Sequence, residues 1–157
     1  LPKPLLLLLC LLVILLNLSL VFKLGKDQLK PIYNLIYYFE REKNFEKPSI
    51  QALWLNLGVF LSFLFFPREC SAVGVVITAV GDGFAGIVGY HFGKTKIGNK
   101  SLEGALAFFV STSLVLFPFL GPKAFLVALA GTLVELFSRR IDDNFLLPLV
   151  GSLVACL

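Results

Sequence analysis

Histidine and charged residues are scarce in this sequence of 157 residues, and methionine is absent. The single histidine, His91, excludes a metal site built from several histidines and gives a Ser-His-Asp hydrolase no supporting arrangement. Asp, Glu, Lys and Arg make up 15% of the chain, whereas soluble globular domains contain about 25%. Because translation starts with Met, we expect residues to precede Leu1. The scarcity of charge argues against an ordinary soluble enzyme.

Two short motifs are also missing. No Gly-x-x-x-x-Gly-Lys-Ser/Thr segment is present, which excludes a P-loop nucleotide site. The three cysteines, Cys10, Cys70 and Cys156, form no Cys-x-x-Cys pair and lie in or beside apolar segments. Free cysteine commonly packs as a small hydrophobic residue. We therefore expect three small buried side chains without a metal or redox role.

Apolar residues make up 57% of the chain and are collected in long runs. Residues 5–22 are apolar apart from Asn17 and Ser19, and about 18 such residues are long enough to span a bilayer. A signal peptide would have a shorter apolar core, of about 7–15 residues, and a small-residue cleavage site that is missing here. Further apolar segments follow at 51–66, 71–89, 102–120, 124–137 and 145–157.

Each of these segments is expected to be a helix, because a bilayer requires paired backbone groups and strict alternation of apolar and polar residues is absent. The expected fold is all-α, a polytopic membrane helix bundle of about six transmembrane helices plus one interfacial amphipathic helix. We expect a single integral membrane domain over 1–157. Its first span is 1–22, its interfacial helix lies in 23–48, and 49–157 forms a catalytic bundle.

The basic residues predict which side of the membrane each loop faces. With six spans, one side receives 11 Lys and Arg residues, and the other receives Lys3, Arg68 and Lys123. The positive-inside rule assigns the richer side to the cytoplasm and both termini to the opposite side. In a prokaryote this would be the inner or plasma membrane. Because the topology accounts for the net charge of +4, we predict no nucleic-acid partner.

The charged stretch after the first span has helical periodicity. Its apolar and aromatic residues fall near one helical face, namely Leu29, Ile32, Tyr33, Ile36 and Phe39. The amphipathic rings of Tyr33, Tyr37 and Tyr38 suit a headgroup boundary. We expect a helix that lies in the cytoplasmic interface, with a solvated connecting helix as the alternative.

Five acidic residues fall on the predicted cytoplasmic side or just within the membrane from it: Asp82, Glu103, Glu135, Asp142 and Asp143. Asp82 and Glu135 lie inside apolar runs, where an ionised carboxylate costs roughly 2.5–3.5 kcal/mol unless a cation, metal or water compensates it. Such residues are candidates for function. The alternative is a buried salt bridge to Arg139, Arg140 or a loop lysine.

Glycines and lysines are concentrated in 81–104, which we expect to be a nucleotide-binding loop. Glycine backbone can approach a ligand closely, and the N–H groups at a helix N-terminus favour an anion. The candidate nucleotide-binding residues are Gly81, Gly83, Gly89, Gly93, Lys94, Lys96, Lys100, Ser101 and Gly104, with Asn144 from a later segment. Ser101 is also expected to cap the following helix. Gly86 and Gly89 fit close helix packing equally well.

Several of these residues form a recognisable series of motifs. They are Gly81-Asp82-Gly83-Phe84-Ala85, Gly89, Phe92-Gly93-Lys94 and Lys100-Ser101-Leu102-Glu103-Gly104, followed by Glu135, Asp143-Asn144 and Pro148. The series resembles the signature of the family of dolichol kinases, phytol kinases and CTP-dependent diacylglycerol kinases, from about Gly58 to the C-terminus. Part of it is shared with phosphatidate cytidylyltransferases.

The resemblance implies a CTP-dependent lipid kinase, with CTP as the phosphate donor and Mg²⁺ as the cofactor. The γ-phosphate would pass to the hydroxyl of a membrane lipid alcohol, such as a polyprenol or dolichol, a phytol-like alcohol or diacylglycerol. The expected catalytic residues are Asp82, Glu103 and Glu135, and the expected metal ligands are Asp82, Asp142 and Asp143. Asp82 is the favoured group for orienting the acceptor hydroxyl or taking its proton.

Two other functions stay open on the sequence. One is CDP-lipid synthesis of the phosphatidate cytidylyltransferase type, which would use the same cradle and release pyrophosphate. The other is a non-enzymatic lipid transporter or assembly subunit whose acids line a pathway. A homodimer that completes the lipid groove is a further expectation.

Overall fold

The computed structural model describes residues 1–25, 27–28, 30–39, 45–138 and 141–157, and these residues are almost entirely helical. The elements are α1 (Lys3–Val21), α2 (Lys30–Phe39), α3 (Ile50–Phe65), α4 (Arg68–Val76), the π-helical η2 (Ile77–Asp82), α5 (Gly83–Phe92), β1 (Lys96–Ile97), β2 (Lys100–Ser101), α6 (Leu102–Leu120), α7 (Lys123–Phe137) and α8 (Asp143–Cys156). The all-α prediction is confirmed. Leu29, Arg139 and Arg140 lie outside the described part, as do three others of the 11 basic residues counted above, Lys26, Arg41 and Lys43.

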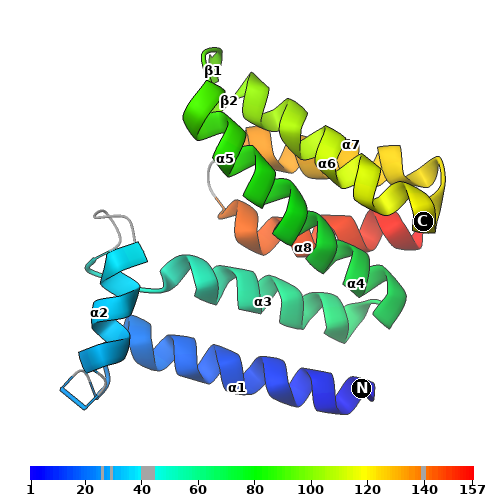
Figure 1. Cartoon of the computed structure of the whole chain (residues 1–157). Helices are drawn as coiled ribbons and strands as arrows, with labels where there is room; N and C mark the ends of the chain where they lie inside the picture. Colours follow the sequence, from blue (N-terminus) through cyan, green and yellow to red (C-terminus); the bar gives the residue numbers. More distant parts are fainter. Residues whose placement is uncertain (26, 29, 40–44, 139–140) are drawn as a thin grey trace.

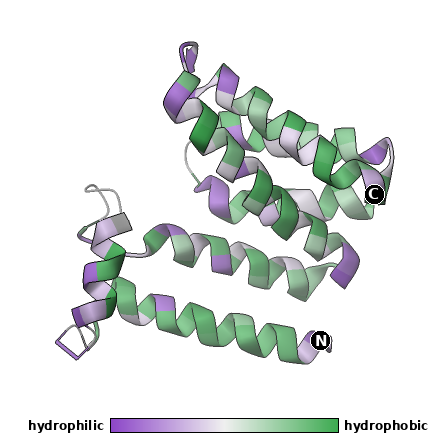
Figure 2. Ribbon diagram, viewed as in Figure 1, coloured by the Kyte–Doolittle hydropathy of each residue, from purple (hydrophilic) through white to green (hydrophobic). Residues whose placement is uncertain are grey.

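The helices carry their apolar residues along their length and their polar residues mainly near their ends (Figure 2). Within the described part, three helical stretches are long and apolar enough to cross a membrane: α1, the continuous rod from Arg68 to Phe92 that joins α4, η2 and α5, and α6. Helices α3 and α8 are apolar but shorter. The protein is therefore a membrane protein, and six spans remain a prediction.

The two ends of the helices differ in what they carry (Figure 1). Both chain termini lie at one end, and the β1–β2 hairpin, α2 and the start of α8 lie at the other. Successive connections between the long helices thus lie at alternate ends, as the sequence predicts for loops on two sides of a membrane. In α2, Tyr33 is buried, and its hydroxyl lies 3.3 Å from the carbonyl oxygen of Leu20 at the end of α1. An interfacial position for α2 stays a prediction.

The main core lies where η2, α6, α7 and α8 meet, around the fully buried Ile77, Phe108, Val127 and Leu147. Small residues allow the helices to approach closely, as is common in membrane bundles. A Cβ atom on Gly74 would overlap the carbonyl of Pro148 and the hydroxyl of Ser152, so α4 can pack on α8 only with glycine there. A second, smaller cluster joins α1 and α3.

The run 81–104, expected from the sequence to be a loop, is helical over much of its length. Gly81 and Asp82 end η2, α5 continues to Phe92, and only residues 93–101 lie outside helices. Glycine costs only about 1 kcal/mol relative to Ala in a helix. Unpaired backbone inside a bilayer costs several kcal/mol for each group, so the helix is retained through the glycines.

The expectation of three unpaired cysteines is wrong for two of them, because a disulfide joins Cys70 and Cys156. Cys70 lies in the first turn of α4 and Cys156 ends α8, and the packing of these helices brings the two Cα atoms to 5.5 Å. The pair is 86 residues apart in the sequence, so no local motif could reveal it. Cys10 is free and half-buried.

Candidate functional site

A cavity of about 1030 Å³ opens at the end of the bundle that carries the hairpin. Residues of α3, α5, the hairpin, α6, α7 and α8 line it together with the end of η2. Its polar and glycine residues are Gln51, Asp82, Gly86, Gly89, Lys96, Gly98, Asn99, Lys100, Ser101, Gly104, Glu135, Ser138, Asp142, Asp143 and Asn144. Segments far apart in the sequence therefore contribute polar groups to one space.

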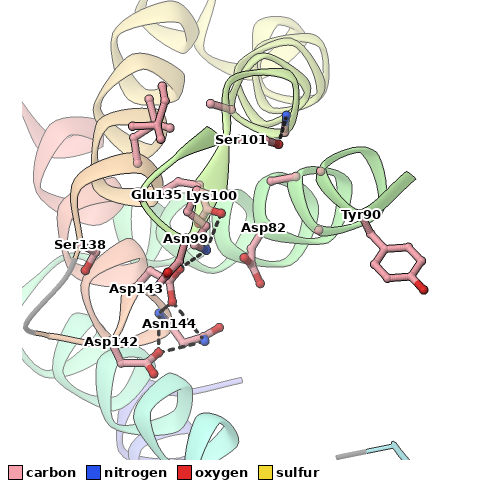
Figure 3. Close-up of a pocket in the computed structure, with 18 of the residues that line it drawn as sticks. Asp82, Tyr90, Asn99, Lys100, Ser101, Glu135, Ser138, Asp142, Asp143 and Asn144 are labelled. Atoms are coloured by element: carbon pink, nitrogen blue, oxygen red, sulfur yellow. Dashed lines mark hydrogen bonds and ion pairs between the residues drawn. The ribbon is translucent and has the colours of Figure 1, made fainter. Parts of the chain in front are cut away.

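Three carboxylates form a cluster in this cavity (Figure 3). Asp82 ends η2, Glu135 lies near the end of α7, and Asp143 begins α8. One oxygen from each of the three carboxylates lies within 4.8 Å of the other two. A π-helical turn widens the helix locally and is frequent at functional sites, and here it immediately precedes α5 and ends at Asp82.

Lys100 reaches this cluster from strand β2. Its Nζ atom lies 2.6 Å from Glu135 Oε1 and 2.5 Å from Asp143 Oδ2. Burial disfavours the charge of Lys100, but the attraction of Glu135 and the hydrogen bonds to both carboxylates outweigh it, so the pKa of Lys100 is raised. The ion pair that the sequence left open is thus present, with a hairpin lysine as the cation.

Glu135 keeps one carboxylate oxygen unpaired. Its side chain is 5% exposed, and Oε1 accepts a hydrogen bond from Lys100. Its Oε2 is buried and has no hydrogen-bond partner among the described residues. An unpaired carboxylate oxygen in a buried position is costly. Together with two neighbouring carboxylates, this oxygen makes the cluster suited to a divalent cation that prefers oxygen ligands.

Asp142 and Asn144 build the start of α8. Asp142 Oδ1 accepts hydrogen bonds from the Asn144 backbone N–H at 3.0 Å and from its side-chain amide at 2.9 Å. Asp142 is the N-cap of α8, a position that favours Asp because its side chain pairs a free N–H group. Asp143 Oδ1 accepts from the same backbone N–H at 3.0 Å. Asn144 thus holds both acids in place.

The hairpin is fastened to the first turn of α6. Ser101 is the N-cap of α6, and its hydroxyl accepts from Gly104 N–H at 3.1 Å, as expected from the sequence. The carboxylate of Glu103 accepts from Thr95 N–H, at 3.0 Å to Oε1 and 3.2 Å to Oε2. Gly98 adopts a φ of 63°, which glycine tolerates without strain, and lies in the turn between the strands.

The structure brings together most, but not all, of the site residues expected from the sequence. Ten of them line the cavity: Asp82, Gly89, Lys96, Lys100, Ser101, Gly104, Glu135, Asp142, Asp143 and Asn144. Gly81, Gly83, Gly93, Lys94 and Glu103 do not line it. Gly81 faces Phe108 and Gly93 faces Gly89 and Ser101, so these two glycines permit close packing.

Several lining residues were not anticipated from the sequence. Trp54 and Gln51 come from α3, Tyr90 from α5 and Asn99 from the hairpin turn, and Ser138 directly follows α7 as its C-cap. Trp54 also packs edge-on against Phe145, with ring centroids 5.9 Å apart. A polar Gln at the start of an apolar helix, followed by the only Trp, was an available signal for α3.

Comparison with known proteins finds relatives of two kinds. The uncharacterized protein MJ1137 of Methanocaldococcus jannaschii is 35% identical over 147 residues, which are 90% of this chain and 74% of that protein. Phytol kinase 1 of Arabidopsis thaliana is 31% identical over 153 residues, or 82% of this chain and 50% of the kinase. The phytol kinase of a Synechocystis species is 33% identical over 99 residues, or 54% of this chain and 42% of the kinase.

The chain thus spans about half the length of the phytol kinases that it matches. No family model matches the sequence. No solved structure matches it either.

Proposed function

The chain belongs to the family of the Methanocaldococcus jannaschii protein MJ1137, and from this premise and its partial likeness to phytol kinases we propose that it is a membrane kinase of a prenyl alcohol. The observation that carries the proposal is the cavity cluster, in which three carboxylates and a lysine meet and one buried oxygen of Glu135 has no hydrogen-bond partner among the described residues. A phosphate-transferring site needs these charges to hold metal and phosphate.

Asp82, Glu135 and Asp143 are the proposed ligands of Mg²⁺. These carboxylates would hold the ion in the cavity, where it would supply positive charge to the phosphates of a bound nucleotide. Asp142 lies one residue away, but its Oδ1 caps α8. We therefore assign Asp142 to positioning Asn144 and Asp143, in place of the direct ligand role expected from the sequence.

The hairpin and the start of α6 are the proposed phosphate-binding wall. Lys96 and Lys100 line the cavity from paired strands, and Ser101 and Gly104 line it from the N-terminus of α6. Lysine side chains and the N-terminal end of a helix both favour phosphate. CTP is the proposed donor, on the resemblance to the CTP-dependent kinases; the described residues select no particular base.

In the proposed reaction the hydroxyl oxygen of the prenyl alcohol forms a bond to the γ-phosphorus of the nucleotide. The bond from that phosphorus to the β–γ bridging oxygen breaks, and the nucleoside diphosphate leaves with the bridging oxygen. The hydroxyl proton passes to a carboxylate, for which we favour Asp82. Asp82 reaches the cluster from the side of α5, whereas Glu135 and Asp143 reach it from the other side (Figure 3).

The site is proposed to face the cytoplasm. The hairpin end of the bundle carries Lys94, Lys96 and Lys100, and the end with the termini carries the Cys70–Cys156 disulfide. Positive residues accumulate on the cytoplasmic side, and disulfides persist on the oxidising side. Both features therefore support the same orientation, in which soluble nucleotide reaches the cavity from the cytoplasm.

The proposal is tested with purified protein in lipid nanodiscs, Mg²⁺ and phytol or geranylgeraniol. With CTP labelled at the γ-phosphate, label is expected in an organic-phase phosphate ester, and CTP labelled at the α-phosphate should leave that phase unlabelled. Glu135→Gln should abolish the transfer, while the control Glu69→Gln, an exposed acid at the far end of the rod, should retain it. Transfer of α-label to lipid would instead indicate a cytidylyltransferase.

A further inference from the structure

The cavity reaches beyond the charged cluster to the side of the bundle between α3 and α5. Trp54 of α3 and Tyr90 of α5 line the same space as the three carboxylates, and they are 38% and 85% exposed. Helix α3 packs on α1, α4 and α8, whereas α5 packs on α6. Helix α3 and the rod that ends in α5 therefore diverge from the turn that joins α3 and α4 (Figure 1). The charged cluster is therefore continuous with an aromatic opening at the side.

Gly86 lies on the α5 wall of this opening. A Cβ atom built on Gly86 meets nothing within 4 Å, so no neighbouring helix requires a glycine there. This differs from Gly81 and Gly131, where a Cβ would overlap Phe108 of the core. Glycine in a helix destabilises it relative to alanine unless something else needs the space. Within the described residues, the space over Gly86 is part of the cavity.

Large apolar side chains are exposed on α5 outside the cavity. Phe84 and Ile87 are 52% and 60% exposed, as expected for a helix surface that meets hydrocarbon. The lateral opening thus joins an apolar exterior to a polar interior. A molecule with a long hydrocarbon chain and one hydroxyl end matches both environments: its chain leaves through the opening and its hydroxyl meets the carboxylates.

We propose that the hydrocarbon chain of the prenyl alcohol passes between α3 and α5, over Gly86 and between Trp54 and Tyr90. Gly86 is then a specificity-determining residue, because its missing side chain leaves the width that a methyl-branched chain needs. This assignment rests on the proposed kinase function for the identity of the alcohol. The placement of the chain itself is measurable without catalysis.

The first experiment uses geranylgeraniol with a diazirine on its chain, irradiated with nucleotide-free protein in nanodiscs. Labelled peptides are expected from α3 around Trp54 and from α5 around Tyr90, and unlabelled phytol should compete. Labelling mainly on other helices would overturn the assignment. Equal labelling of the same peptides by a diazirine phosphatidylcholine would also overturn it, because the opening would then accept any lipid chain.

The second experiment enlarges position 86 in two steps, with Gly86→Ala and Gly86→Leu. The KM for geranylgeraniol should rise with side-chain size, by about tenfold or more for leucine, as overpacking commonly costs that much. Photolabelling should fall in parallel, and Mn²⁺ binding by the carboxylates should be unchanged, which shows that the variant is folded. Ala72→Leu, an exposed small residue on the same rod outside the cavity, is the control and should match the wild type.

A Gly86→Leu protein that is labelled and active like the wild type would refute the role of Gly86. If the wild type is labelled between α3 and α5 but transfers no phosphate, the kinase proposal fails and the binding site for the chain stands. If phosphate is transferred but the label lies elsewhere, the kinase stands and this inference fails.

Discussion

Replacing Lys100 by Met should make the nucleotide-free protein bind divalent cations more tightly. The ammonium group of Lys100 lies between Glu135 and Asp143, at hydrogen-bond distance from both. It would therefore compete with a divalent cation for the same two carboxylates. The side chains of the two acids are 5% and 16% exposed, so water compensates little when the lysine is removed.

The size of the effect follows from the burial of the three groups. Removing one partner of a buried ion pair costs about 3–5 kcal/mol, because it leaves unpaired charge. Lys100 is 33% exposed, and solvent screening reduces the relevant value to about 2 kcal/mol. About 1.4 kcal/mol corresponds to a factor of ten in affinity, and protonation of one acid absorbs part of the energy. We therefore expect Lys100→Met to bind a divalent cation about 10- to 30-fold more tightly than the wild type.

Titration of Mn²⁺, followed by electron paramagnetic resonance in the absence of nucleotide, measures this directly. Lys96→Met is the matched control, because Lys96 lines the same cavity from the paired strand and is exposed. It should leave the Mn²⁺ affinity within about twofold of the wild type, as expected for an exposed charge. Phosphate transfer should fall in both variants. If Lys100→Met binds Mn²⁺ no more tightly than the wild type, the account of a shared cation position is refuted.

Asp82, the metal, the Glu103 contact and the disulfide can each be tested separately. Asp82→Asn should lower phosphate transfer by at least about 100-fold, the scale of general acid–base catalysis, while membrane insertion stays normal; a fully active variant would contradict the role of Asp82. EDTA should abolish transfer and Mg²⁺ should restore it, whereas EDTA-resistant activity would exclude a metal held by the carboxylates. Glu103→Gln should speed hydrogen exchange at the backbone amide of Thr95, which donates a hydrogen bond to the Glu103 carboxylate. Unchanged exchange would show that this contact does not restrain the hairpin. Dithiothreitol, which opens the Cys70–Cys156 disulfide, should lower stability by about 2–4 kcal/mol, measured by thermal unfolding, whereas the Cys70→Ser, Cys156→Ser double variant should not respond to it.

The helices could be predicted from the sequence because the bilayer imposes long apolar runs. The breaks between them also followed from local chemistry: Pro67 precedes α4, and Gly121, with a φ of 56°, separates α6 from α7. Asp82 and Glu135 were recognisable as candidate site residues because a charged group within an apolar run is costly. Such a group is therefore expected to have a function or to form an ion pair. These inferences need only neighbours in the sequence.

The grouping of the acids could not be predicted in the same way. Asp142 and Asp143 are adjacent in the sequence, yet one caps α8 and the other joins Asp82 and Glu135. Which of the two does so depends on how α8 packs on α7. The pairing of Lys100 with the cluster and the disulfide between α4 and α8 depend on long-range packing too.

The glycines of 81–104 show a different limit. Sequence alone left Gly86 and Gly89 open between packing and binding. In the structure, a Cβ atom on Gly89 would lie 3.1 Å from Ser101 Oγ, whereas one on Gly86 meets open space. The two glycines therefore differ in their surroundings, and only the position of the neighbouring elements distinguishes them.

The most direct test of the central claim is mass spectrometry of the products formed by the purified protein from CTP, Mg²⁺ and geranylgeraniol or phytol in nanodiscs. A prenyl monophosphate and one equivalent of CDP are expected from the wild type, and neither is expected from Asp82→Asn. No prenyl monophosphate from folded protein that binds Mn²⁺, or a CDP-linked lipid with pyrophosphate, would contradict the central claim.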